Sequence, residues 1–348
     1  MMRRFAFRIT VLAILAVQLL PAVSNRMSRF YYLEDTMAHA SLESHYGDIG
    51  SLSPVWFTVE TDGALSSTVD PKLVSWAAAR KLPLIPTVAN RDFKPEAVQA
   101  ACSEGVREKL IAALMKIAAE NHFAGFELDI EEVPAPLRNT FSSFVGELAG
   151  ALHKQNMLLG VAIPAPLTPG SAPEIAPPLW VGNPRAGAFD FRQLASVADS
   201  LTLMAYDEYT SPAQPGPVAG FAWVEACIRN ILQLVPPQKL LLGLALYYRH
   251  WSGTKVTEGP FAAARALAAK SALTFALDAS HREMTLGFSE GAVKNVLWCE
   301  DASNLAARLA LVDRHGLLGF AAWRLGQEDP DVWEKVFHQF SGKEVSAK

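Results

Sequence analysis

The sequence is poor in cysteine and contains no long basic run and no glycine-rich phosphate motif. Its three cysteines, Cys102, Cys227 and Cys299, lie far apart without CxxC or metal-ligand spacing. At most one disulfide is therefore possible, and three buried thiols are the simpler expectation. The formal net charge of -4 argues against a nucleic-acid partner. Neither GxGxxG nor a GxxxxGKS or GxxxxGKT loop occurs, so nucleotide binding has little support and we expect no cofactor.

Metal-ligand motifs are also missing. The histidines are scattered, with no HxH or HExxH pair, so a catalytic zinc site is not expected. We predict no resident metal, although an all-oxygen magnesium site stays open as a third hypothesis.

The N-terminus has the pattern of an export signal. Arg3, Arg4 and Arg8 precede an apolar run over residues 9–23, which is short for a membrane span of about 20 residues. We predict a signal peptide over residues 1–24, cleaved near Ser24, with an uncleaved membrane anchor as the alternative. The remainder, 25–348, is then expected to be exported, either periplasmic or secreted, with membrane contact only if the signal is retained.

After residue 25, short apolar runs alternate with helix-like stretches. Eight predicted strands cover residues 29–35, 52–60, 81–90, 124–131, 157–166, 200–209, 239–251 and 317–326. Amphipathic helices are predicted over 94–121, 137–156, 220–235, 302–316 and 329–340. This order favours an α/β protein with a (β/α)8 TIM barrel, over an open doubly wound sheet. Residues 252–300 do not fit one βα unit, and we interpret them as a small α+β insertion between strands seven and eight.

The stretch GFELDIEEVP, residues 125–134, alternates carboxylates with apolar residues. Glu127, Asp129 and Glu131 share one face of the predicted fourth strand. A solvent-facing strand would explain this pattern, but parallel barrel strands are covered on both faces, which favours inward carboxylates. Such a cluster should share a proton and raise at least one pKa, as a general acid requires. Glu131 lies nearest the C-terminal end, where barrel active sites form.

Other predicted strand ends carry side chains suited to a polar ligand. Tyr206 and Asp207 end the sixth strand, and Trp323 ends the eighth, where an indole can support a sugar ring. In isolation, Tyr206 and Asp207 could equally be a buried tyrosine beside a nearby acid, and for Trp323 a core tryptophan is the commoner case. Around the acids we expect a substrate-binding set made of Glu127, Trp323, Trp56, Tyr247, Tyr248 and Arg249. Acids surrounded by aromatics, with few cations, indicate a neutral carbohydrate ligand.

These motifs resemble glycoside hydrolase family 18, the chitinase-like family. Its fourth-strand motif DGxDxDxE is matched by AGFELDIE, and its M-x-Y-D signature by Met204, Tyr206 and Asp207. Trp323 matches the tryptophan of the family's last strand. The phrases DIEEVP, LMAYDEY, LWCEDASNLAARL and GFAAWRLGQEDP are similar to a bacterial branch containing spore-cortex-lytic N-acetylglucosaminidase domains. That branch also includes domains joined to polysaccharide deacetylases and glycosyltransferases.

The resemblance implies retaining hydrolysis in which the substrate's 2-acetamido oxygen attacks the anomeric carbon, giving an oxazolinium-like intermediate. By position, Glu131 would be the general acid and then the base. Asp129 would hold the acetamido N–H, Tyr206 would bind the acetamido oxygen, and Asp207 would support the sugar or Tyr206. Trp323 would form the floor of the pocket. The implied partner is an N-acetylglucosamine-containing polysaccharide.

Two positions depart from the family motif. Ala124 replaces its first aspartate, and Glu127 its middle one. They motivate an alternative function, a catalytically inactive glycan-binding protein with the same barrel. The choice among chitin, peptidoglycan and a β-1,6-linked exopolysaccharide stays open, as does endo or exo action.

Overall fold

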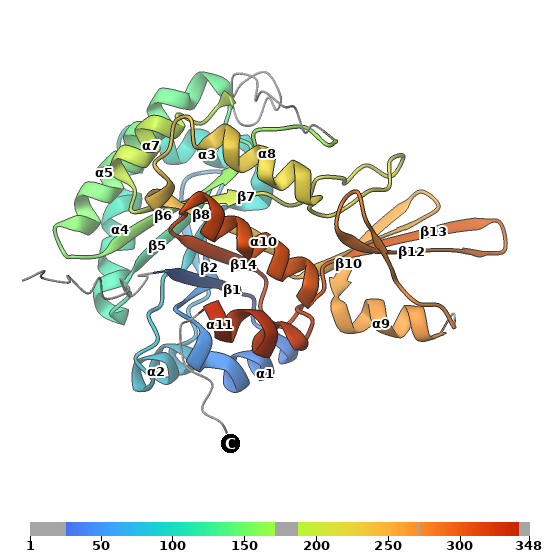
Figure 1. The fold of residues 1–348 in the computed structure, drawn as a ribbon. Helices are drawn as coiled ribbons and strands as arrows, with labels where there is room; N and C mark the ends of the chain where they lie inside the picture. The colour runs from blue at the N-terminus through green and yellow to red at the C-terminus, as the bar shows by residue number, and fades with distance from the viewer. Residues whose placement is uncertain (1–25, 171–186, 271, 341–348) are drawn as a thin grey trace, which may run out of the picture.

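A computed structural model describes residues 26–170, 187–270 and 272–340 (Figure 1). The predicted signal peptide and its alternative, an anchor, lie outside these residues. Within the described part of the chain, none of the helices combines the length and apolarity required to span a bilayer.

Eight parallel strands close into a barrel. Their order is β1-β14-β8-β7-β6-β5-β4-β2, and pairing of β1 with β2 completes the ring. The strands are β1 (Met27–Tyr32), β2 (Ser51–Val59), β4 (Thr87–Asn90), β5 (Gly125–Asp129), β6 (Leu158–Pro164), β7 (Ser200–Met204), β8 (Leu240–Ala245) and β14 (Gly319–Trp323). A short strand, β3 (Leu65–Ser67), adds to β2 in antiparallel orientation. The predicted (β/α)8 TIM barrel is confirmed.

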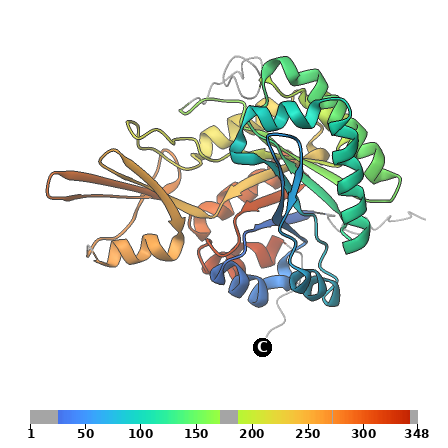
Figure 2. The same cartoon turned by 180° about the vertical axis from the view of Figure 1, so that it is seen from behind.

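Helices cover the outside of the barrel (Figures 1 and 2). They are α1 (Thr36–His45), α2 (Pro71–Ala79), α3 (Pro95–Cys102), α4 (Val106–Asn121), α5 (Arg138–His153), α7 (Phe191–Val197), α8 (Phe221–Ile231), α10 (Ala302–His315) and α11 (His338–Phe340), the last preceded by a π-helical turn at Trp333–Phe337. The single helix predicted over 94–121 is divided into α3 and α4, because Gly105 adopts a left-handed φ of 78°. Outward side chains such as Phe126 and Leu128 on β5 are fully buried against this layer.

The insertion forms a second, antiparallel sheet with the order β10-β9-β13-β12-β11. Its elements are β9 (Tyr247–Ser252), β10 (Lys255–Pro260), helix α9 (Phe261–Lys270), β11 (Ala276–Asp278), β12 (Glu283–Glu290) and β13 (Val293–Cys299). The sheet projects from one side of the barrel, with α9 beside it (Figure 1). The insertion therefore begins at Tyr247, a few residues before the predicted start at about residue 252. The strand predicted over 239–251 is two strands, because the chain leaves the barrel after β8.

The expected thiols are confirmed. All three cysteines are free and buried. Burial raises the pKa of the Cys227 thiol beyond its ordinary range and that of Cys102 to about 11. Neither thiol therefore resembles an activated nucleophile.

Candidate active site

The three carboxylates of the predicted fourth strand lie at increasing height in the barrel. Glu127 sits in the middle of β5 with no exposed surface, and Asp129 is the last residue of the strand. Glu131 lies two residues beyond it, at the C-terminal face, and is partly exposed. The inward orientation predicted from the alternation is confirmed by the contacts of Glu127 with β1 and β7 across the interior.

Glu127 is bound on both carboxylate oxygens. The Arg29 guanidinium on β1 donates to Oε2. The hydroxyls of Tyr31 and Thr202 donate to Oε1, at 3.0 Å and 2.7 Å. Opposite Glu127 on β6 is Gly160, where an added Cβ would lie 1.7 Å from Oε2. The absence of a side chain at Gly160 makes room for the ion pair.

Asp129 differs from Glu127 in its hydrogen bonds. Its Oδ1 atom is buried and has no hydrogen-bond partner in the structure. Burial raises the pKa of Asp129 well above its usual value, and the charges of Glu131 and Glu127 raise this pKa further. Asp129 is therefore the carboxyl whose raised pKa the cluster predicts. A protonated carboxyl beside Glu131 can hold a proton for exchange with a ligand or with its neighbour.

The backbone of Glu131 is clamped by Asn90, the last residue of β4. The Glu131 N–H donates to Asn90 Oδ1 at 2.9 Å, and Asn90 Nδ2 donates to the Glu131 carbonyl at 3.0 Å. Asn90 itself is only 3% exposed. This pair of bonds fixes the Glu131 backbone just after the regular strand ends.

Tyr206 follows β7 and lies close enough to the acids to interact electrostatically with them. Burial raises the pKa of the Tyr206 phenol well above its usual value, and the charges of Asp129 and Asp207 raise it further. The phenol therefore stays protonated and can act as a hydrogen-bond donor. Gly243 on β8 leaves space for this ring, since a Cβ there would lie 2.9 Å from Tyr206 Cε1 and 2.5 Å from the Leu203 carbonyl oxygen.

Asp207 is held by the first strand of the insertion. The Tyr247 hydroxyl donates to its Oδ1, and Arg249 Nη2 forms an ion pair with the same oxygen at 2.8 Å. Arg249 also reaches Glu258 on β10 at 3.0 Å. Asp207 adopts a left-handed φ of 60° and keeps an exposed side chain. The insertion thus determines the surroundings of a predicted catalytic residue.

Trp323 ends β14, as predicted, at the same face of the barrel. Its ring lies 5.4 Å from that of Tyr31 in an edge-to-face arrangement. Trp323 and Tyr206 are both partly buried and both pack against the cluster around Tyr247 and Trp251. Trp323, Tyr206 and the carboxyl groups of Asp129, Glu131 and Asp207 therefore lie together where the barrel strands end.

The structure places five residues of the predicted substrate-binding set away from an open rim. Trp56 is 5% exposed and packs against Phe123 in the layer between strands and helices, because a bulge at residues 55–57 breaks the alternation of β2. Tyr248 points to the opposite face of β9 from Tyr247, into the insertion's own core. Glu127 is buried beneath Asp129, out of direct reach of a ligand. Tyr247 and Arg249, both at most 5% exposed, contact Asp207 and do not line an open rim.

The sequence reasoning missed the residues that support the site. Glu127 is contacted by Arg29, Tyr31 and Thr202. Glu131 is held by Asn90. A signal for Arg29 existed, since an arginine inside a predicted barrel strand requires a buried carboxylate partner. No comparable pattern marks Asn90, whose role depends on the spatial neighbourhood of β4 and β5.

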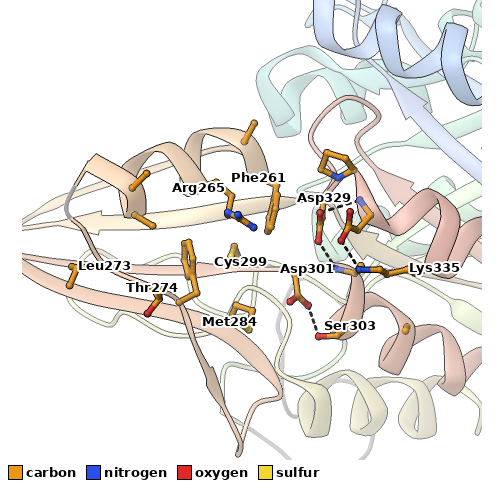
Figure 3. A pocket seen from close by; sticks show the side chains of 18 residues that line it. Phe261, Arg265, Leu273, Thr274, Met284, Cys299, Asp301, Ser303, Asp329 and Lys335 are labelled. Carbon is orange, nitrogen blue, oxygen red and sulfur yellow. Dashed lines mark hydrogen bonds and ion pairs between the residues drawn. The ribbon is translucent and has the colours of Figure 1, made fainter.

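Among the described residues, no group of three or more His, Cys, Asp or Glu side chains could hold a metal ion. A large cavity of about 1070 Å³ lies elsewhere, between α9 and the start of α10 (Figure 3). Phe261, Met284 and Cys299 line it, with Asp329 and Lys335 on the barrel side. None of the carboxylates of β5 contributes to this cavity.

A family model matches most of the barrel, including the strand that carries the acids. The chain belongs to the glycosyl hydrolases family 18, whose model matches residues 85–328. The match extends from just before β4 to just beyond β14 and so includes β5, β7 and Trp323.

The matches to individual relatives have low sequence identity but cover most of this chain. An uncharacterized glycosylase of Bacillus subtilis, YvbX, is 20% identical and covers 88% of this chain and 89% of its own. The crystal structure of a chitinase from Chromobacterium violaceum is 27% identical, with a TM-score of 0.80 over 89% of this chain and 98% of that one. The spore cortex-lytic enzyme SleL of Bacillus megaterium is 20% identical, with a TM-score of 0.78 over 89% and 72%. The predicted resemblance to family 18 and its spore-lytic branch is confirmed.

Proposed function

We propose that this protein is an exported glycosidase that hydrolyses β-linked N-acetylglucosamine-containing glycans with retention of configuration. The observation that carries the proposal is the buried, unpartnered Oδ1 of Asp129, in a carboxyl of raised pKa adjoining Glu131. Membership of family 18 supports glycan hydrolysis. The likeness to a chitinase and a spore cortex-lytic enzyme makes chitin and peptidoglycan the first substrates to test.

In the proposed mechanism the Glu131 carboxyl gives its proton to the glycosidic oxygen as the bond to the anomeric carbon breaks. The substrate's acetamido oxygen attacks that carbon from the opposite face, and an Asp129 oxygen accepts a hydrogen bond from the acetamido N–H, which favours this geometry. Tyr206 donates to the acetamido group and Trp323 supports the sugar ring. Glu131, now a carboxylate, then takes a proton from water, which opens the oxazolinium-like ring and restores the β configuration.

The test uses protein that begins at Asn25, with Glu131→Gln and Glu120→Gln as a matched pair. Glu120 lies on α4 with a 59% exposed side chain and a surface ion pair of 3.9 Å to Lys116, so its change controls for the loss of a carboxylate far from the site. Each protein is incubated with β-1,4 and β-1,6 N-acetylglucosamine oligomers and with peptidoglycan. Mass spectrometry identifies the products, and NMR determines the anomer first released.

Wild type and Glu120→Gln should cleave one of these substrates to the β anomer, with or without a chelator. Glu131→Gln should lose about 10²–10⁴-fold in turnover while still binding, because a positioned general acid contributes that much. Release of the α anomer would exclude a retaining mechanism. Binding of glycans by wild type without cleavage of any would make the protein a glycan-binding module.

A further inference from the structure

Inside the barrel, Arg29 of β1 and Glu127 of β5 form an ion pair with almost no exposure, 1% and 0% respectively. Two hydroxyl donors, from Tyr31 and Thr202, complete the surroundings of the carboxylate. Breaking such a pair by removing one partner leaves an uncompensated buried charge. The Glu127 carboxylate therefore contacts one cation and two neutral hydroxyl donors.

The strands are shaped around this pair. Glu127 pairs in register with Gly160 of β6, and an added Cβ at Gly160 would lie 2.5 Å from Arg29 Nη1 as well as 1.7 Å from Glu127 Oε2. On β1 the alternate residues Phe30 and Tyr32 face the helices, which directs Arg29 and Tyr31 inward. The pair is therefore built into the fold from three strands.

Glu127 is also the charge directly beneath Asp129. Burial raises the pKa of Asp129 most, and the charges of Glu131 and Glu127 raise it further. Arg29 contacts Glu127, and its positive charge offsets part of the negative charge beneath Asp129. The titratable and charged groups around this end of the barrel are Glu127, Glu131, Arg29, Tyr31, Tyr206 and Asp207.

We propose that Arg29 is a positioning residue, which holds Glu127 as a compensated carboxylate and so keeps the proton at the strand end between Asp129 and Glu131. Without Arg29, the negative charge of Glu127 would act on Asp129 in full. The consequence for catalysis rests on the proposed function, in which Glu131 must deliver a proton. The charge arrangement itself can be tested without turnover.

The experiment is a pH titration of the side-chain carboxyl carbons by NMR in protein labelled at Asp and Glu, with Asp129→Asn used to assign Asp129. The variants are Glu127→Gln, Arg29→Met, the double variant, Arg29→Lys and Thr202→Val. Glu127→Gln leaves Arg29 unshielded, so Asp129 should titrate at a pH lower by about one unit, a tenfold change. Arg29→Met leaves Glu127 uncompensated, so Asp129 should titrate at higher pH. In the double variant, the titration pH of Asp129 should return towards the wild-type value. Arg29→Lys keeps the positive charge, so its Asp129 should titrate as in wild type.

Thr202→Val removes one donor to Glu127 but no charge, so it keeps the test decisive if a charge variant does not fold. It should shift Asp129 in the same direction as Arg29→Met, but less. Unchanged titration of Asp129 in Thr202→Val and in every charge variant that folds would overturn the proposal and leave Arg29 with a structural role only. The pH dependence of kcat/KM should follow the NMR shifts. Shifts with no glycan cleavage by wild type would refute the proposed function and retain this inference.

Discussion

The Asn90 clamp makes a prediction that separates positioning of the general acid from stability. In Asn90→Ala, Glu131 loses both backbone bonds, of 2.9 Å and 3.0 Å, that hold it at the end of the strand. Asn90 Nδ2 also loses its bond to the Lys94 carbonyl, at 3.2 Å. A hydrogen bond contributes about 1 kcal/mol to stability, so the loss of all three should cost about 3 kcal/mol. Unfolding entropy of about 2.1 cal/mol/K per residue, over roughly 320 residues, converts this to a Tm lower by about 4.5 °C.

The effect on catalysis should be larger than the effect on stability. Freed from Asn90, the Glu131 backbone can move, and a displacement of about 1 Å can cost about 10²-fold in rate. We expect kcat to fall by about 10–100-fold with little change in KM, because Asn90 is buried and lies beneath the proposed ligand site. Cleavage of the substrate identified with wild type, alongside thermal unfolding, measures both quantities.

Asn304→Ala is the matched control. Asn304 is equally buried, with 3% exposure. Its Oδ1 accepts hydrogen bonds from the N–H groups of Met284 and Asp301, at 3.2 Å and 3.4 Å. These bonds connect the insertion with the start of α10 and lie far from β5 in the sequence. Loss of the Asn304 side chain should lower Tm and leave kcat unchanged. An Asn90→Ala enzyme with a lowered Tm and the full wild-type kcat would refute the reasoning, since Glu131 would then be positioned by other contacts.

Two further predictions concern stability. Because burial raises the pKa of Asp129, its ionisation costs stability as pH rises above the unfolded-state value of about 3.9. Asp129→Asn should therefore have a higher Tm than wild type at neutral pH, a difference that vanishes near pH 3, while losing turnover; equal Tm values at pH 7 would contradict this. Gly160→Ala should cost about 1–3 kcal/mol by overpacking the Arg29–Glu127 pair, whereas Gly150→Ala on α5, with nothing within 4 Å of the new methyl, should gain up to about 1 kcal/mol. Chemical unfolding of both variants checks this, and equal effects would count against the crowding at Gly160.

The alternation of β5 could be interpreted from the sequence because a parallel barrel strand has only two environments, and both were identified correctly. The same rule failed for Trp56, where the bulge at residues 55–57 lets Trp56 and Phe57 both enter the outer core. It failed for Tyr248 because the chain joins a different sheet after Leu246, and alternation there refers to a different core. Periodicity predicts a face only while the strand and its sheet continue.

The contacts that complete the site depend on pairing between distant strands. Arg29 and Glu127 are separated by 98 positions, and Asn90 and Glu131 by 41. The register of neighbouring strands brings each pair together, and a single sequence does not show that register. This is why the acids could be predicted, while their counter-ion and their clamp could not.

The two departures from the family motif have different consequences once the barrel is known. Ala124 precedes the N-terminal end of β5, where its backbone bonds to Leu84 and Leu158 at 2.8 Å each. At about 3.3 Å per residue it lies on the order of 20 Å from Glu131, so a missing carboxylate there removes nothing from the C-terminal face. Glu127 adds a methylene to the position beneath Asp129, and Arg29 and Gly160 accommodate the longer side chain and its charge. The acid pair at the strand end therefore keeps its chemistry, which favours an active glycosidase over a binding protein that has lost catalysis.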